Sequence, residues 1–132
     1  MERSEGMKKI IVFALATVFL LAACGNNKVD DSAAKEYIKK SKETISLFNE
    51  EKFDEMRSMF DATMKDALSV EQLQEVSDIV KESGEFVSFE KESVAKKEQY
   101  FVATIATKYK EDNRVYTITL DEQQQVAGFF VK

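Results

Sequence analysis

The chain has 132 residues, with 24 acidic and 19 basic side chains, no histidine and a single cysteine. The absence of histidine excludes serine–histidine and cysteine–histidine nucleophile pairs. Zinc sites built from cysteine and histidine are also excluded, because the chain has no histidine and only one cysteine. The acidic balance argues against nucleic acid as a partner, because proteins that bind it carry a basic footprint.

The first 23 residues have the pattern of a secretory signal. Lys8 and Lys9 precede an uncharged run over residues 10–23, which is shorter than the about 20 apolar residues of a transmembrane helix. Met7 is an alternative start, because Met7-Lys8-Lys9 alone supplies a positive end.

The apolar run ends in Leu21-Ala22-Ala23-Cys24, which resembles the lipobox of bacterial prolipoproteins. The resemblance implies cleavage between Ala23 and Cys24 and a diacylglyceryl group on the Cys24 sulfur, and two acyl chains suffice for stable anchoring. The alternative is an ordinary secreted protein with a chance cysteine. We expect residues 1–23 to be a lipoprotein signal peptide and the protein to lie on the extracytoplasmic face of the cell membrane, held by the lipid on Cys24.

The lipidated cysteine is followed by a polar, turn-prone segment, so residues 24–31 are interpreted as a tether. Seven residues of tether reach at most about 25 Å. The chain from Cys24 onward has 16 basic and 22 acidic side chains, which argues against a domain that lies flat on an anionic leaflet. Residues 32–132 have the length of one domain with a single core.

Hydrophobic periodicity predicts three helices before Gly84, because apolar side chains recur there at steps of three and four. A kink is expected near Asp61, within the second helix. The third helix begins with a capping box, in which the Ser69 and Gln72 side chains each accept a bond from the other residue's backbone amide. The predicted ranges are 32–48, 53–68 and 69–83.

After Gly84 the hydrophobic period changes to two, which predicts four strands joined by short turns as an antiparallel meander. Helices followed by strands indicate an α+β fold, in which three helices pack on a curved four-stranded antiparallel sheet. Phe129-Phe130-Val131 is apolar on both faces, so the last strand is expected to be central or covered, with a homodimer interface as one candidate cover. The predicted ranges are 86–94, 100–109, 115–120 and 126–131.

Residues 45–89 resemble a known family. They are similar to a bacterial lipoprotein domain family called domain of unknown function 3887. The matching residues are Phe48-Asn49-Glu50-Glu51-Lys52-Phe53-Asp54, Met59-Phe60, Met64-Lys65, Leu68, Leu73 and Gly84-Glu85-Phe86. The order of helices and strands resembles the cone-shaped fold of nuclear transport factor 2. Glu51-Lys52 stands where the family usually has glycine-aspartate, and Val76-Ser77 where a tryptophan is frequent. The resemblance transfers no catalytic residue.

The resemblance implies a pocket between the curved sheet and the helices. Such pockets are apolar with a few placed polar groups. The alternative is that the tyrosines are half-buried, with their hydroxyls at the surface. The candidate pocket residues are Tyr37, Asp61, Tyr100 and Tyr116, with Tyr109 as a further tyrosine.

Carboxylates are the second kind of candidate group. Relatives that isomerise or hydrolyse small molecules use a pocket carboxylate as acid or base, a role that Asp61 or Asp66 would take here. The alternative is that both are solvated helix residues.

Three functional hypotheses follow. The first is a non-catalytic domain, anchored to the membrane through Cys24, that binds a small molecule, a peptide or an envelope protein without a cofactor or metal. The second is a small isomerase- or hydrolase-type enzyme that uses a pocket carboxylate. The third is that residues 17–23 of the signal are the active product, because some Gram-positive lipoprotein signals are trimmed to peptide pheromones.

The lipobox gives the first prediction. Cells that express the wild type are expected to incorporate labelled palmitate into the protein, whereas Cys24→Ala is expected to remain unlabelled because the acceptor sulfur is gone. Label can be measured in the purified proteins. Equal label in both would contradict lipidation at this position.

Overall fold

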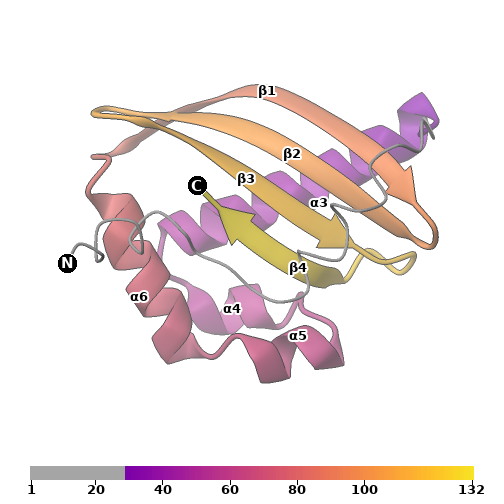
Figure 1. Cartoon of the computed structure of the whole chain (residues 1–132), viewed down its shortest axis with the longest axis horizontal. Helices are drawn as coiled ribbons and strands as arrows, with labels where there is room; N and C mark the ends of the chain where they lie inside the picture. Colours follow the sequence, from indigo (N-terminus) through magenta and orange to yellow (C-terminus); the bar gives the residue numbers. More distant parts are fainter. Residues whose placement is uncertain (1–28) are drawn as a thin grey trace.

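The structure is a computed structural model in which residues 29–132 are described. The predicted signal peptide, its cleavage site, Cys24 and most of the tether lie outside the described residues. No helix within the described range is long and apolar enough to cross a membrane. The elements, in chain order, are α3 (Asp31–Asn49), α4 (Phe53–Arg57), α5 (Ala62–Ala67), α6 (Val70–Lys81), β1 (Phe86–Lys97), β2 (Tyr100–Tyr109), β3 (Asn113–Leu120) and β4 (Val126–Val131) (Figure 1).

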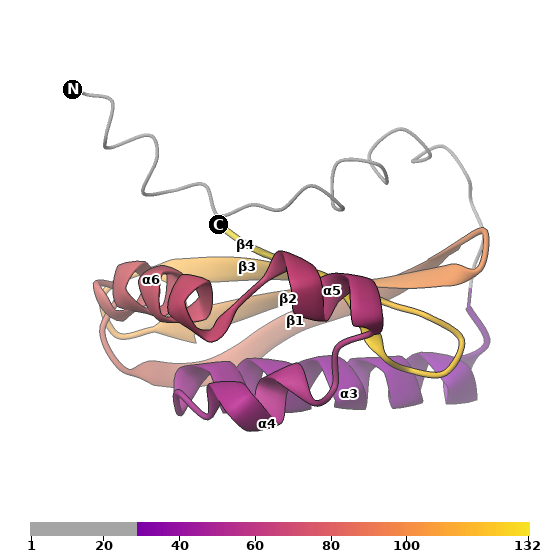
Figure 2. The same cartoon turned by 90° about the horizontal axis from the view of Figure 1, so that it is seen from below.

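The four strands form one open antiparallel sheet in the order β1-β2-β3-β4. The α+β class and the antiparallel meander are therefore confirmed. Helix α3 lies along one face of the sheet and packs against β1, β2 and β3, and α4 lies beside it (Figure 2). This arrangement brings the end of α3 close to α6 and the start of β1 (Figure 1).

The described part of the chain has four helices, so the prediction of three is wrong. The predicted second helix is interrupted where Phe60 forms a parallel bridge with Val126. The Asp61 amide donates to the Val126 carbonyl at 2.9 Å, and the Val126 amide donates to the Met59 carbonyl at 2.7 Å. Because these backbone groups bond to the sheet, they cannot continue a helix, and the expected kink becomes a break between α4 and α5.

Helix α6 starts as predicted. The Ser69 hydroxyl accepts from the Gln72 amide at 3.1 Å, and the Gln72 side chain accepts from the Ser69 amide at 2.9 Å, which completes the capping box. The helix ends at Lys81, and Gly84 follows with a φ of 89°.

Strand β1 is longer than predicted and continues to Lys97. The turn to β2 is shorter than expected, and Glu98 adopts a left-handed conformation with φ of 60°. Register shifts at Phe86/Ser88 and Phe89/Lys91 let the long β1 follow β2.

Strand β4 lies at the edge of the sheet, so the prediction of a central position is wrong. Its apolar side chains are nevertheless covered within the chain. Phe129 and Val131 are buried in the core, and Val126 is bonded to the α4–α5 connection.

Phe48, near the end of α3, lies at the centre of the core. Its ring centroid is 5.2 Å from that of Phe129, 6.1 Å from that of Tyr116 and 6.2 Å from that of Phe53. One side chain therefore joins α3 to α4, β3 and β4.

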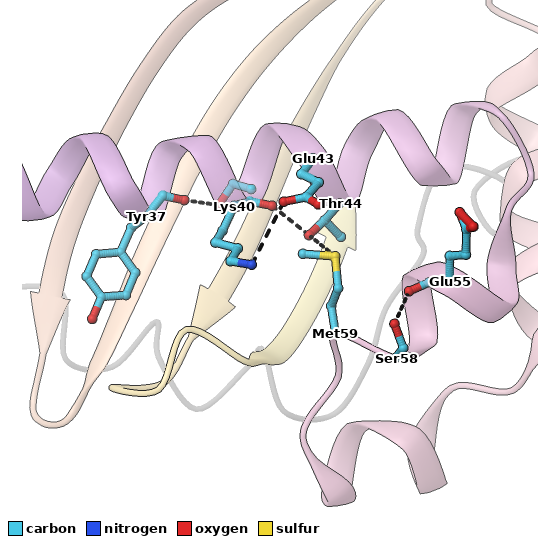
Figure 3. A network of polar contacts seen from close by, with 8 residues as sticks. Tyr37, Lys40, Glu43, Thr44, Glu55, Ser58 and Met59 are labelled. Atoms are coloured by element: carbon cyan, nitrogen blue, oxygen red, sulfur yellow. Dashed lines mark hydrogen bonds and ion pairs between the residues drawn. The ribbon is translucent and has the colours of Figure 1, made fainter.

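A polar contact joins α3 to the segment after α4. The Thr44 hydroxyl donates to the Lys40 carbonyl at 2.8 Å and contacts the Met59 sulfur at 3.7 Å (Figure 3). The buried hydroxyl thus has a backbone acceptor within its own helix, as buried polar groups require.

Gly84 fixes the path from α6 to β1. A Cβ at this position would lie 3.0 Å from the Glu111 Cγ and 3.1 Å from the Lys110 Cβ. The backbone conformation and the close approach therefore both favour glycine.

We expect Gly84→Ala to lower the free energy of unfolding by roughly 1–3 kcal/mol, because the new Cβ adds strain at positive φ and crowds the β2–β3 turn. Urea unfolding followed by circular dichroism measures this change. Glu85→Ala is the control. Its side chain is 81% exposed, so it is expected to cost no more than about 0.5 kcal/mol. Equal stability of Gly84→Ala and wild type would contradict the proposed constraint.

Candidate functional site

A cleft lies where the end of α3, helix α6 and the first residues of β1 meet. Its volume is about 420 Å³. It combines apolar walls with a small number of polar groups, which is the usual character of a ligand site. The lining residues are Phe48, Asn49, Ser77, Val80, Lys81, Gly84, Glu85, Phe86 and Tyr109.

The apolar walls come from three elements. Phe48 belongs to α3, Val80 to α6 and Phe86 to β1. The Phe86 ring meets the Tyr109 ring edge to face, with centroids 5.6 Å apart, a favourable geometry for aromatic pairs. This contact aligns the start of β1 with the end of β2.

The polar part of the cleft is a chain of three side chains. The Tyr109 hydroxyl donates to the Asn49 Oδ1 at 2.8 Å and lies 2.6 Å from the Tyr116 hydroxyl. Because Tyr109 has one hydroxyl proton and gives it to Asn49, Tyr116 donates to Tyr109. Tyr116 is fully buried, whereas Asn49 and Tyr109 line the cleft.

Both tyrosines stay protonated at neutral pH. Burial raises the pKa of Tyr109 above its usual 10.0, although its hydrogen bonds with Tyr116 and Asn49 act in the opposite direction. Burial raises the pKa of Tyr116 well above 10.0, and the adjacent Tyr109 raises it further. The pair therefore offers neutral hydroxyls for hydrogen bonding and not a phenolate base.

Charged side chains stand at the rim of the cleft. Lys81 forms an ion pair with Glu51, a residue in the α3–α4 connection with a φ of 61°. The hydrogen bond to Glu51 raises the pKa of the exposed Lys81. Outside the lining of the cleft, the Arg114 Nε donates to the Ser83 hydroxyl at 2.7 Å, which connects β3 to the segment after α6.

The predicted pocket tyrosines are distributed over the domain. Tyr37, in the first half of α3, stacks on Phe101 with ring centroids 4.0 Å apart. Its burial, with contributions from Glu122 and Asp121, raises its pKa. Tyr100 lies at the start of β2, opposite Lys97. Of the four candidate tyrosines, Tyr109 lines the cleft and Tyr116 adjoins it through Tyr109.

The two candidate carboxylates lie on α5. Asp61 is the N-cap of this helix, and its Oδ1 accepts from the Met64 amide at 2.8 Å. Asp66 is exposed on the same helix. Neither lines the cleft, and no group of three or more Asp, Glu or Cys side chains within residues 29–132 is arranged to hold a metal ion.

Comparison with known proteins identifies the family. Residues 41–129, about two thirds of the chain, match a family described as a protein of unknown function, DUF3887. The chain belongs to the DUF3887 family. No curated protein and no solved structure matches it.

The cleft lies within the DUF3887 region. Phe48, Asn49, Gly84, Glu85 and Phe86 are among the residues that carry the sequence resemblance, and all five line the cleft. Asn49 and Ser77 were missed as site residues because polar residues near helix ends look like solvated positions in a sequence.

The tyrosine pair gives a prediction about stability. Tyr109→Phe leaves the buried Tyr116 hydroxyl without its acceptor, so it is expected to lower the free energy of unfolding by about 1–3 kcal/mol. Tyr116→Phe is expected to cost less, because Tyr109 keeps Asn49 as acceptor. The double variant is expected to cost less than the sum of the two, because no hydroxyl is then left unpaired. Urea unfolding of the wild type, the two single variants and the double variant measures these differences in the free energy of unfolding.

Tyr37→Phe is the matched control for this cycle. It keeps the stacked ring, and the Tyr37 hydroxyl has no hydrogen-bond partner among the described residues. Its cost is expected to stay within about 0.5 kcal/mol. Strictly additive losses for Tyr109 and Tyr116 would show that the two hydroxyls are not coupled.

Proposed function

We propose that this DUF3887 protein is an extracytoplasmic lipoprotein, anchored to the cell membrane by lipid on Cys24, whose domain binds a ligand without chemical conversion. The ligand is a small molecule or a short segment of an envelope protein. The observation that carries the proposal is the cleft in which Asn49 and Tyr109 stand between walls formed by Phe48 and Phe86.

The polar groups of the cleft support a role in orientation. The Asn49 Oδ1 is occupied by Tyr109, so the amide nitrogen of Asn49 remains as a donor toward a ligand. The Tyr109 oxygen retains one lone pair as an acceptor. A ligand with one acceptor and one donor beside an apolar body fits this pattern.

The absence of an acid–base pair at the cleft supports binding over catalysis. The tyrosines are held neutral, and Glu85 is solvated and paired with Lys110 at 3.7 Å. The second hypothesis, an isomerase or hydrolase that uses Asp61 or Asp66, gains no support from their places on α5. In particular, Asp61 has a structural role as a helix cap.

The fold proposal accompanies the functional one. We infer that the domain is a nuclear transport factor 2-like cone, in which a long first helix crosses an antiparallel meander. The path of α3 across β1, β2 and β3 supports this assignment.

Native mass spectrometry tests ligand binding. The protein, purified from bacterial membranes in mild detergent, is expected to carry a bound mass beyond that of the lipidated chain. Asn49→Ala is expected to lower its occupancy about tenfold, because a hydrogen bond to the ligand and the acceptor that orients the Tyr109 hydroxyl are both lost.

Gln123→Ala is the control, because Gln123 is exposed in the β3–β4 turn and is not among the residues that line the cleft. It is expected to retain the wild-type occupancy. A wild type with no bound mass, or equal loss in both variants, would contradict binding at the cleft and favour interaction through the surface.

A further inference from the structure

The charges of the domain are separated along its length. Residues 35–42 contain four lysines and one glutamate, whereas residues 50–82 contain ten acidic and four basic side chains. The first group lies in the first two thirds of α3, and α4 and α6 lie toward the opposite end of the molecule in both views (Figures 1 and 2). A domain of net negative charge thus carries a local group of lysines on the first part of α3, with the acidic Asp121 and Glu122 near Tyr37 on the same helix.

These lysines gather on one side of α3. Lys35, Lys39 and Lys42 follow one another at steps of four and three, which places them in one row. A shallow hollow of about 340 Å³ is lined by these three lysines together with Ile38 and Glu92. We call this group the lysine row.

The lysine row has more cationic side chains than ion-pair partners among the described residues. Lys42 is occupied, because its Nζ is 2.8 Å from Glu92 and lies over the Phe89 ring. Lys35 and Lys39 are exposed and have no ion-pair partner within the described residues. Lys40 adds a further charge nearby, with only a 3.9 Å contact to Glu43 (Figure 3).

We propose that the lysine row docks on the anionic lipid headgroups of the membrane to which the protein is tethered. The proposal rests on the proposed lipid anchor. Seven residues from Cys24 to Asp30 reach at most about 25 Å, and Lys35 lies only about 6 Å along α3 from its start. The row is therefore within reach of the leaflet, and each lysine near an anionic surface contributes to attraction.

This contact restricts the orientation of the domain. The lysine row runs along the side of α3, so docking places this side of the helix toward the leaflet. The cleft, formed at the end of α3 and on α6, shares no lining residue with the row and stays outside the docked surface. A ligand reaches it from the side of the cell wall or medium.

Amine footprinting of the lipidated full-length product tests the orientation. The protein is reconstituted in vesicles of phosphatidylcholine with or without about 30% phosphatidylglycerol, floated, and acetylated. Lys35 and Lys39 are expected to react about tenfold more slowly on the anionic vesicles, and salt near 1 M is expected to remove the protection because the Debye length falls to about 3 Å. Lys65 and Lys108, exposed elsewhere, are expected to react equally on both.

Paired variants separate the lysine row from general charge effects. Lys35→Gln/Lys39→Gln is expected to abolish the protection of Lys40 and Lys42, whereas the matched Lys65→Gln/Lys108→Gln is expected to keep it. Circular dichroism confirms that both fold.

The outcomes distinguish the two proposals. A floated protein whose lysine row reacts at the same rate on both vesicles, or whose protection survives in Lys35→Gln/Lys39→Gln, overturns the docking surface alone. A protein that does not float overturns the lipid anchor and the docking surface together.

Discussion

The burial of Phe48 is the contact on which the rest of the domain depends. Its ring meets aromatic rings from α4, β3 and β4, so one side chain fixes the long helix relative to both the helical layer and the sheet. A domain of this size has a total stability of about 5–15 kcal/mol, and the loss of a buried phenylalanine removes about 3–5 kcal/mol. No other residue described joins α3 to so many aromatic partners.

The cleft inherits its geometry from this contact. Asn49 follows Phe48 directly, so its amide is held at the point where α3 ends above the sheet. The Tyr116 hydroxyl lies in the core and is satisfied only through Tyr109. The hydrogen bonds among Tyr116, Tyr109 and Asn49 hold these side chains in one arrangement, so the polar groups that face a ligand are positioned before it arrives.

Local features of the sequence predicted most of the fold. The capping box at Ser69, the alternation of β2 and the short turns depend on neighbouring residues, and each appears in the structure. The break between α4 and α5 depends on Val126, which is distant in sequence and leaves no local signal. The cleft is harder still to predict from the sequence, because Asn49 and Tyr109 meet only through tertiary packing. Residue type selected the tyrosines as candidates, but the sheet register places Tyr109 at the cleft and the packing of α3 places Tyr37 on Phe101.

The bridge between Phe60 and Val126 has a consequence for synthesis of the chain. Strand β4 is made last, yet it supplies the hydrogen bonds that hold the α4–α5 connection. Its Val126, Phe129 and Val131 side chains also belong to the core. A nascent polypeptide that has not reached residue 126 therefore lacks the partner that closes its interior. Completion of the core is therefore postponed until translation of the domain is nearly finished.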